Sequence, residues 1–336
     1  MQNLANRIPV SIIAGFLGAG KTTLLNNILS EDHGKKIAVL VNEFGEIGID
    51  HALIVASSDQ VIELANGCIC CSIRGDLVLA IDQLLKRRDN FEYLLVETTG
   101  LADPAPVAQT FLADERMLSI FRLDGVITLI DSMHFCDLLE GKLSAENADT
   151  AIKQIAFADR IVVNKIDLVS ESVVDNVLAR IRAINANAVV LKTSYGNIDH
   201  VSLLNIEGFS LESVEAADPA FLTREYHDHL GDTQSIGMRL EQPIDIQLLN
   251  IWLRWLLTDP DMQIYRMKGV VDVGHEHERY VFQGVQQLFT SRPEGSWPTD
   301  EKPSSMITII GRNLNGDLIR ERLETCVLDP EVSQEK

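Results

Sequence analysis

The sequence predicts an α/β protein in which a doubly wound, mostly parallel sheet is followed by a smaller α+β domain. Two observations support this fold class. Between residues 10 and 205, short apolar runs alternate with segments of helical periodicity. Several of these runs are apolar throughout, which is typical of parallel strands covered by helices on both faces.

The first domain is predicted to span residues 1–206. Strands are expected at residues 10–14, 37–41, 60–64, 93–97, 126–131, 160–164 and 188–191, and helices separate most of them, for example at 22–29, 75–87 and 172–185. Helices between apolar strands are the pattern of a doubly wound domain.

Residues 207–233 are predicted to form an acidic connector, because residues 207–232 contain seven acidic residues and one basic residue. A C-terminal α+β domain is predicted for residues 234–336. Its expected elements are a strand at 235–239, a helix at 244–257, strands at 263–273, 280–288 and 306–310, and a helix at 317–326.

Composition narrows the range of partners. The 29 basic and 49 acidic residues give a net charge of -20. Such a surface repels phosphate backbones and anionic lipids, so no nucleic-acid or membrane partner is expected. No apolar run approaches the ~20 residues of a membrane-spanning helix, and the polar first residues lack the apolar stretch of a signal peptide. A cytoplasmic location is therefore expected.

Residues 15–22, GFLGAGKT, match the phosphate-binding pattern G-x-x-x-x-G-K-[ST] at every required position, between an apolar strand and a helix. Lys21 is expected to reach the β- and γ-phosphates, and the Thr22 hydroxyl to bind Mg²⁺. The alternative is a glycine-rich turn without a ligand. The expected nucleotide contacts here are Gly15, Phe16, Leu17, Gly18, Ala19, Gly20, Lys21, Thr22 and Thr23.

A second motif indicates the base. Asn164, Lys165 and Asp167 belong to the sequence NKID at the end of a later predicted strand. An aspartate accepts two hydrogen bonds from guanine, whereas adenine offers no matching pair of donors, so GTP is predicted over ATP. Thr193 and Ser194 lie where a second loop beside the base would fall.

The sequence ETTG at residues 97–100 closes another strand, where a γ-phosphate-sensing switch would lie. Gly100 can offer its N–H to that phosphate, and Glu97 could hold a Mg²⁺-bound water. The alternative is a strand end followed by a turn. Lys21, Glu97 and Gly100 are thus the predicted catalytic residues of a GTPase. Slow turnover is expected, because no glutamine or histidine evidently positions the attacking water.

Three of the five cysteines lie within four residues, at Cys68, Cys70 and Cys71. Their sulfurs could converge on one ion, and the positive end of the following helix favours thiolates. Thiolates suit Zn²⁺, Cu⁺ or iron–sulfur clusters. Buried structural cysteines and a redox pair with a resolving thiol are the alternatives.

Three sulfurs leave a tetrahedral ion one ligand short. Structural zinc sites are usually closed by four ligands, so an incomplete shell suits an ion that leaves by ligand exchange. Glu43 is the candidate fourth zinc ligand, with Glu46, a histidine or a water as other choices. A closed structural zinc site, completed from elsewhere in the chain, stays open as an alternative.

The histidines carry weaker signals. His227 and His229 in the connector could relay metal, but solvated loop residues are an equal interpretation. His275 and His277 alternate on what reads as a hairpin, where a surface turn is favoured. The other residues of this kind are interpreted as packing or incidental surface residues: His134, Cys136 and Cys326.

With these motifs together in one sequence, the chain resembles the CobW family, metal-associated GTPases of the SIMIBI class of P-loop proteins. The C-terminal part is similar to that family's second domain at residues 268–270, 283–285 and 310–312. The resemblance implies a metallochaperone that delivers zinc, or in some branches cobalt or another ion, with GTP binding and hydrolysis gating transfer. It also implies that Cys68, Cys70 and Cys71 are the metal ligands. Many members carry a histidine-rich stretch, of which this chain has only two sparse pairs.

We therefore expect a GTP-hydrolysing metallochaperone, with GTP, Mg²⁺ and Zn²⁺ (or Co²⁺) as cofactors and a client metalloprotein as partner. One alternative is a GTPase with a purely structural zinc site, and another is cobalt delivery for cobalamin or a cobalt enzyme. Two further classes are a small-molecule kinase, which the guanine motif opposes, and a non-enzymatic redox sensor. The oligomeric state stays open.

Overall fold

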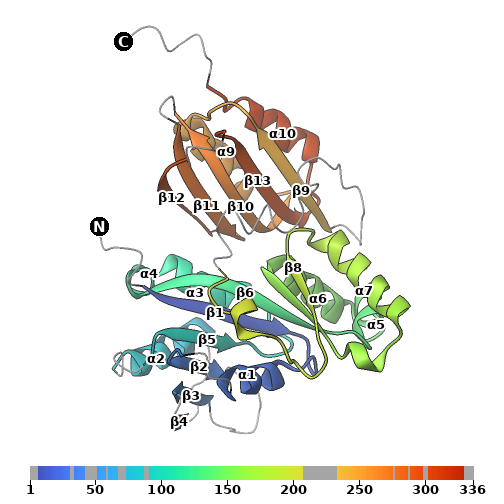
Figure 1. Cartoon of the computed structure of the whole chain (residues 1–336). Coiled ribbons are helices and arrows are strands. Elements are labelled where there is room, and N and C mark those ends of the chain that lie inside the picture. The colour runs from blue at the N-terminus through green and yellow to red at the C-terminus, as the bar shows by residue number, and fades with distance from the viewer. Residues whose placement is uncertain are drawn as a thin grey trace. The chain divides into compact units, whose positions relative to one another are not determined.

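The computed structural model describes residues 7–30, 34–41, 51–57, 60–66, 73–86, 91–206, 233–274, 277–286, 288–297 and 302–328. The chain divides into two compact units, one containing an eight-stranded sheet and the other a five-stranded sheet (Figure 1). Within the described ranges, no helix is long and apolar enough to cross a membrane.

The strands of the first unit form one mostly parallel sheet, as predicted. They are β1 (Ile8–Gly15), β2 (Ile37–Val41), β3 (His51–Ser57), β4 (Gln60–Asn66), β5 (Tyr93–Glu97), β6 (Phe121–Asp131), β7 (Arg160–Asn164) and β8 (Val189–Lys192). The order is β4-β3-β2-β5-β1-β6-β7-β8. The six strands from β2 to β8 in this order pair in parallel, and β3 and β4 add antiparallel pairs at one edge. The sequence does not predict β3.

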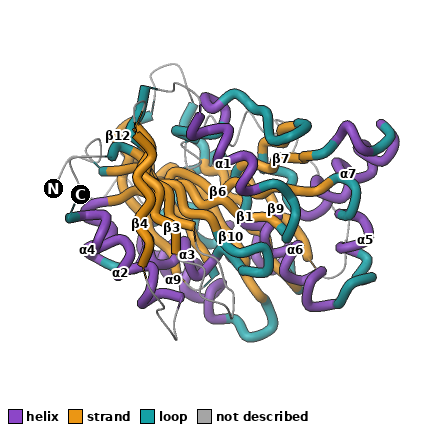
Figure 2. The backbone as a smooth tube through the Cα atoms, turned by 90° about the horizontal axis from the view of Figure 1, so that it is seen from below, coloured by secondary structure: helices purple, strands orange, loops and turns teal. Residues whose placement is uncertain are grey.

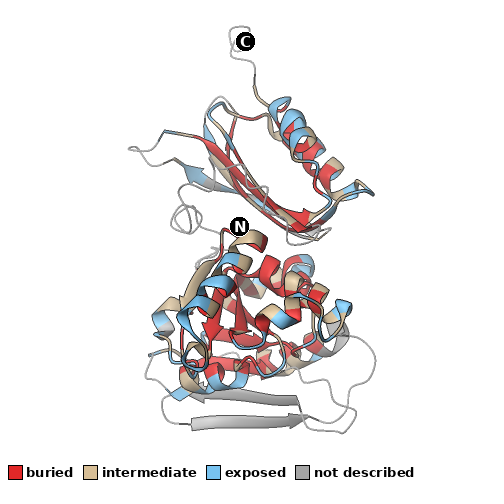
Figure 3. Cartoon of the chain, turned by 90° about the vertical axis from the view of Figure 1, so that its right-hand side faces the viewer, coloured by how far each residue is buried: buried red, intermediate tan, exposed pale blue. Residues whose placement is uncertain are grey.

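Helices surround this sheet (Figure 2). They are α1 (Lys21–Ser30), α2 (Ile73–Leu85), α3 (Ala105–Ala113), α4 (Glu115–Ile120), α5 (Phe135–Leu139), α6 (Ala145–Phe157) and α7 (Glu171–Ile184). Helix α1 contacts β1, and α3 and α6 contact β6. Ile12 and Ile13 are neighbours in β1 and point to opposite faces, yet both are fully buried. The strands in the middle of this unit carry the colour of buried residues (Figure 3). Cover on both faces explains why the strands are apolar throughout.

A buried polar network anchors the end of the first unit to its sheet. The Tyr93 hydroxyl donates a hydrogen bond of 2.5 Å to the Asp124 carboxylate, and the Ile206 N–H donates one of 2.8 Å to the same oxygen. The Ser11 hydroxyl lies 2.7 Å from the Tyr93 oxygen. Burial raises the pKa of Tyr93 well above its usual value, and the Asp124 charge adds to this effect.

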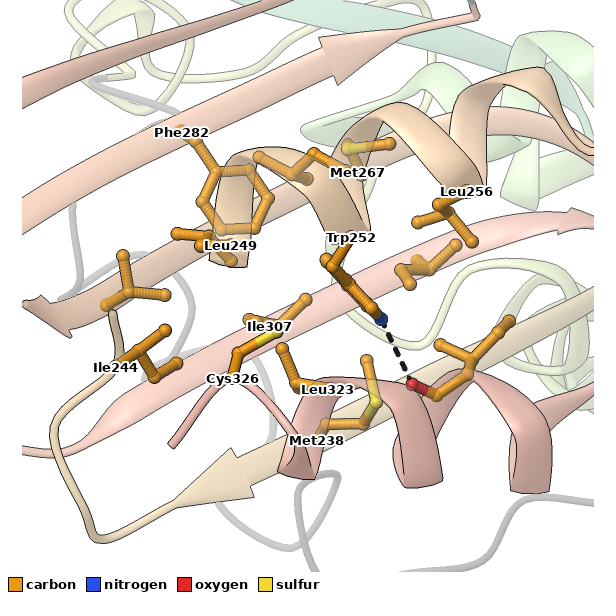
Figure 4. Packing of buried hydrophobic residues seen from close by; sticks show 14 of the residues in the cluster. Met238, Ile244, Leu249, Trp252, Leu256, Met267, Phe282, Ile307, Leu323 and Cys326 are labelled. Atoms are coloured by element: carbon orange, nitrogen blue, oxygen red, sulfur yellow. Dashed lines mark hydrogen bonds between the residues drawn. The ribbon is translucent and has the colours of Figure 1, made fainter. Parts of the chain in front are cut away.

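The second unit is an antiparallel sheet with two helices on one face. Its strands are β9 (Thr233–Leu240), β10 (Gln263–Val273), β11 (Glu278–Val285), β12 (Leu288–Ser296) and β13 (Ser305–Arg312), in the order β12-β11-β10-β13-β9. Side chains of α9 (Ile246–Thr258) and α10 (Gly316–Glu324) share one buried core with the sheet, including Trp252, Phe282 and Leu323 (Figure 4). The Trp252 indole N–H donates to the carbonyl of Ile319 at 3.2 Å.

One prediction for this part needs correction. The single strand predicted at 280–288 is wrong, because β11 and β12 form a hairpin in which Val285 pairs with Leu288. The left-handed position of this turn, with a φ of 53°, is occupied by Gln286. Because glycine or asparagine is the usual residue at such a position, the sequence does not signal the turn. The predicted connector, 207–233, lies outside the described residues except for Thr233, which already begins β9.

Candidate functional site

The turn between β1 and α1 has the geometry of a phosphate-binding loop. The Lys21 ammonium donates to the carbonyl of Gly15 at 2.9 Å and to that of Phe16 at 3.4 Å. Three glycines in the loop have positive φ values, which residues other than glycine rarely adopt: 135° at Gly15, 78° at Gly18 and 102° at Gly20. The glycines therefore curl the backbone around the buried Lys21 ammonium.

Two loop glycines are also required by close neighbours. A Cβ on Gly15 would lie 2.4 Å from the carbonyl oxygen of Leu129, and one on Gly20 would lie 2.5 Å from Nδ2 of Asn164. The Asn164 amide donates to the carbonyl of Ala19 at 2.9 Å. The loop is thus held against β6 and β7, and the first residue of NKID contacts it directly.

Oxygen ligands suited to Mg²⁺ meet beside the loop. The Thr22 hydroxyl donates to the Glu97 carboxylate at 3.4 Å, from the start of α1 to the end of β5. Glu97 is buried, whereas Thr22 is exposed. Hydroxyl and carboxylate oxygens are ligands that Mg²⁺ prefers, so these residues fit the ion predicted from the sequence.

The predicted switch lies against the phosphate loop. A Cβ on Gly100 would be 2.5 Å from the backbone nitrogen of Leu17, so only glycine fits there without displacing the backbone. The buried Gln154 amide, on α6, donates to the carbonyls of Gly100 at 3.3 Å and Ala102 at 3.0 Å. Gln154 thus positions the segment after β5, and nothing in the sequence pattern marks it.

A second loop completes the base side. The Asn164 amide oxygen accepts hydrogen bonds from the backbone N–H groups of Lys165 at 2.9 Å and Gly196 at 3.1 Å. The Thr193 carbonyl accepts a bond of 3.3 Å from the Ile166 N–H. The loop after β8 therefore packs beside NKID, where the sequence places a second base-side loop. Asp167, the last residue of NKID and the one predicted to bind guanine, is exposed.

Lys165 has an ion-pair partner that the sequence does not indicate. Its ammonium donates to the Asp131 carboxylate at 2.7 Å, and His134 Nδ1 lies 3.0 Å from the same oxygen. The His134 side chain is 68% exposed, in keeping with a surface position. The contact depends on the pairing of β6 with β7, which places Asp131 beside Asn164.

The predicted metal ligands are outside the described residues: Cys68, Cys70, Cys71, Glu43 and Glu46, with His227, His229 and His275. Among the residues that are described, no group of three or more histidine, cysteine, aspartate or glutamate side chains could hold a metal ion. His277 lies in the turn just before β11, with Nδ1 2.8 Å from the buried Asp272 carboxylate.

The strand pairing places the ends of β2, β4 and β5. Val41 at the end of β2 pairs with Glu97 at the end of β5, and Asn66 at the end of β4 pairs with His51 at the start of β3. The carboxyl ends of β2, β4 and β5 therefore lie along the same edge of the sheet. Strands are about 4.8 Å apart, so three spacings put Asn66 roughly 14 Å from Glu97. Cys68 is two residues further along the chain.

The phosphate loop after β1 and the NKID motif after β7 meet at one edge of a doubly wound sheet, and this combination is characteristic of P-loop GTPases. The comparisons specify the family. Residues 9–192 match the CobW/HypB/UreG nucleotide-binding domain, and residues 233–327 match the C-terminal domain of the cobalamin synthesis protein cobW. The chain belongs to this family of GTPases, as the sequence motifs indicate.

Named relatives span nearly the whole chain. The zinc chaperone YjiA of Escherichia coli is 39% identical over 320 residues, which cover 94% of this chain and 97% of that protein. The zinc-regulated GTPase metalloprotein activator 1 of Schizosaccharomyces pombe is 30% identical over 349 residues, covering 92% of this chain and 83% of the relative.

Solved structures confirm the two-domain fold. The crystal structure of Zn(II)-bound YjiA GTPase from E. coli has a TM-score of 0.75 and 34% identity, covering 96% of this chain and 100% of that one. A triple mutant of YjiA, with a glutamate and two cysteines replaced by alanine, is also described as Zn(II)-bound, and its structure has a TM-score of 0.74 and 34% identity, covering the same shares of both chains.

Proposed function

We propose that this GTPase binds zinc through Cys68, Cys70 and Cys71 and hands it to a client metalloprotein under control of the bound nucleotide. One observation carries the proposal: β4 ends at the same sheet edge as β5, two residues before the cysteine motif. The relatives named zinc chaperone and zinc-regulated GTPase metalloprotein activator support zinc as the ion.

GTP is proposed to bind along this edge. Lys21 would contact the β- and γ-phosphates, the Gly100 N–H would donate to the γ-phosphate, and Asp167 would accept from guanine. The remaining contacts are proposed for residues 15–23, Asn164 and Lys165. Because Gly100 lies against Leu17, a change at the γ-phosphate would act on both the phosphate loop and the switch.

Thr22 and Glu97 would hold Mg²⁺, directly or through water. When bound, the ion would neutralise charge that develops on the phosphates during hydrolysis. Lys21, Glu97 and Gly100 are the proposed catalytic residues, the first for charge stabilisation, the second for the metal and the third for its N–H. Slow intrinsic turnover and cytoplasmic action are proposed with them.

The coupling is proposed to run through neighbouring strands. β2 leads towards Glu43, the candidate fourth zinc ligand, and β5 leads into the switch that follows Glu97; the two strands pair directly. A nucleotide-dependent rearrangement at this edge would then add or remove a ligand of the zinc ion. One nucleotide state would hold the ion, and the other would open it to the client.

Two alternatives share the same residues. In one, the zinc is structural and resists chelators in every nucleotide state. In the other, cobalt is the delivered ion, for cobalamin or a cobalt enzyme. The zinc-bound triple mutant of YjiA shows that, in that relative, zinc binding survives the loss of two cysteines and a glutamate. The tightest zinc equivalent must therefore be measured separately from weaker zinc.

The test crosses the two sites. Cys70→Ser is expected to abolish the tightest zinc equivalent in a chelator competition and to leave GTP affinity within about twofold, because thiolates are the zinc ligands. Lys21→Ala is expected to do the opposite. Cys136→Ser is the matched control, because Cys136 lies on α5, outside the cysteine motif, and its sulfur accepts a hydrogen bond from the Asn176 amide. Loss of zinc in Cys136→Ser, or its full retention in Cys70→Ser, would contradict the proposal.

A further inference from the structure

The guanine motif contains a lysine that is fixed at both ends. Lys165 has a φ of 62°, a left-handed conformation that is uncommon for residues other than glycine. Its backbone N–H donates to the Asn164 side chain at 2.9 Å, and its ammonium donates to Asp131 Oδ2 at 2.7 Å. The Lys165 side chain therefore reaches from the end of β7 to the end of β6, and the exposed Asp167 follows two residues later in the chain.

We propose that Asp131 is a positioning residue of the guanine site. It holds the aliphatic part of the Lys165 side chain in place to pack against the face of the purine base. This inference rests on the proposed role of Lys165 in binding GTP. An untethered lysine side chain samples many rotamers and loses conformational entropy when a ligand orders it. A lysine side chain that an ion pair already holds binds the ligand without that loss of entropy.

The Asp131 carboxylate is built for this task. Its side chain is 12% exposed, and Oδ2 accepts hydrogen bonds from Lys165 and His134 while Oδ1 accepts one of 3.0 Å from the Met133 N–H. Burial acts to raise the pKa of Asp131, but the bonds from Lys165 and His134 outweigh it and hold the pKa below its usual value. The carboxylate is therefore ionised at neutral pH and rigidly placed.

Asp131 and Asp167 have different roles in this site. The Lys165 side chain would pack against the face of the base, so it cannot distinguish guanine from hypoxanthine. Asp167 would accept hydrogen bonds at the edge of the base, where guanine and hypoxanthine differ, so it can distinguish them. Loss of Asp131 should therefore weaken binding of GTP and ITP by the same factor, whereas loss of Asp167 should change their ratio.

The test is a double-mutant cycle on the full chain, read by titration with fluorescent GDP, and with GTP and ITP as competitors. Asp131→Ala and Lys165→Ala are each expected to weaken GDP binding about tenfold, as for loss of one hydrogen bond between charged groups. The double mutant should be no weaker than Lys165→Ala alone. Asp131→Asn, which keeps an acceptor, should recover part of the affinity. Asp149→Ala is the control, because Asp149 forms an ion pair with Lys153 on α6.

The outcomes separate the two claims. Wild-type affinity in Asp131→Ala together with weak binding in Lys165→Ala would overturn the inference and leave the guanine site intact, and so would losses that add in the double mutant. Wild-type affinity in Lys165→Ala would overturn the proposed role of Lys165 and the inference with it. A changed GTP-to-ITP ratio in the folded Asp131→Asn protein would also contradict it.

Discussion

Gly100 is where the switch and the phosphate loop touch, and its replacement by alanine tests that contact. A Cβ there would lie 2.5 Å from the Leu17 nitrogen and 2.7 Å from the Leu17 Cα, about 0.9 Å inside the 3.4 Å at which ordinary contact begins. Both neighbours are backbone atoms, so the two segments must separate. Overpacking of this kind costs about 1–3 kcal/mol.

Separation by about 1 Å at a catalytic edge can lower a rate roughly 100-fold. Gly100→Ala is therefore expected to reduce GTP hydrolysis by about that factor, and to weaken GTP binding more than GDP binding because GDP lacks the γ-phosphate. Single-turnover hydrolysis and nucleotide titration measure both effects. Gly316→Ala is the control, because its Cβ would meet only Ile236 at 3.4 Å. Wild-type hydrolysis and stability in Gly100→Ala would refute the contact.

Three further predictions follow from buried hydrogen bonds. Because the pKa of Tyr93 is raised in the folded protein, its contribution to stability is present below about pH 10 and is lost as the pH rises further. Between about pH 9 and 11, the free energy of unfolding should therefore fall less in Tyr93→Phe than in wild type. Equal pH slopes for the two proteins would contradict this. Gln154→Ala should lower the free energy of unfolding by about 1–3 kcal/mol and slow GTP hydrolysis, since two carbonyls lose their donor; unchanged denaturation and turnover would argue against it. Trp252→Phe should cost about 1–2 kcal/mol in the second unit with GTP hydrolysis unchanged, and a parallel fall in hydrolysis would be the opposing result.

Much of the first unit could be predicted because its central strands are buried on both faces. The predicted bounds 37–41, 93–97 and 160–164 are those of β2, β5 and β7. The antiparallel β3 was not predicted, although its sequence HALIVAS contains an apolar run at residues 52–56, because so short a run does not by itself distinguish a strand from a piece of buried helix. The hairpin between β11 and β12 was missed because its turn contains Gln286 in a left-handed conformation instead of a typical turn residue.

The phosphate loop and NKID could be identified from sequence because their chemistry is contained in a few adjacent residues. Asp131 and Gln154 could not, because their roles arise from contacts across 34 and 54 positions of the chain. An aspartate that ends a strand and a glutamine on a helix are ordinary residues until the fold brings them to the site. Spacing along the chain carries no trace of such contacts.

The central claim is that nucleotide state and zinc affinity are coupled. The most direct measurement is the dissociation constant of the tightest zinc ion, obtained by chelator competition with GTP, with GDP and without nucleotide. We expect at least about a fivefold difference between the GTP and GDP states, and by linkage zinc must change the ratio of GTP to GDP affinity by the same factor. The same zinc affinity in all three states would contradict the account and leave the zinc as a structural ion.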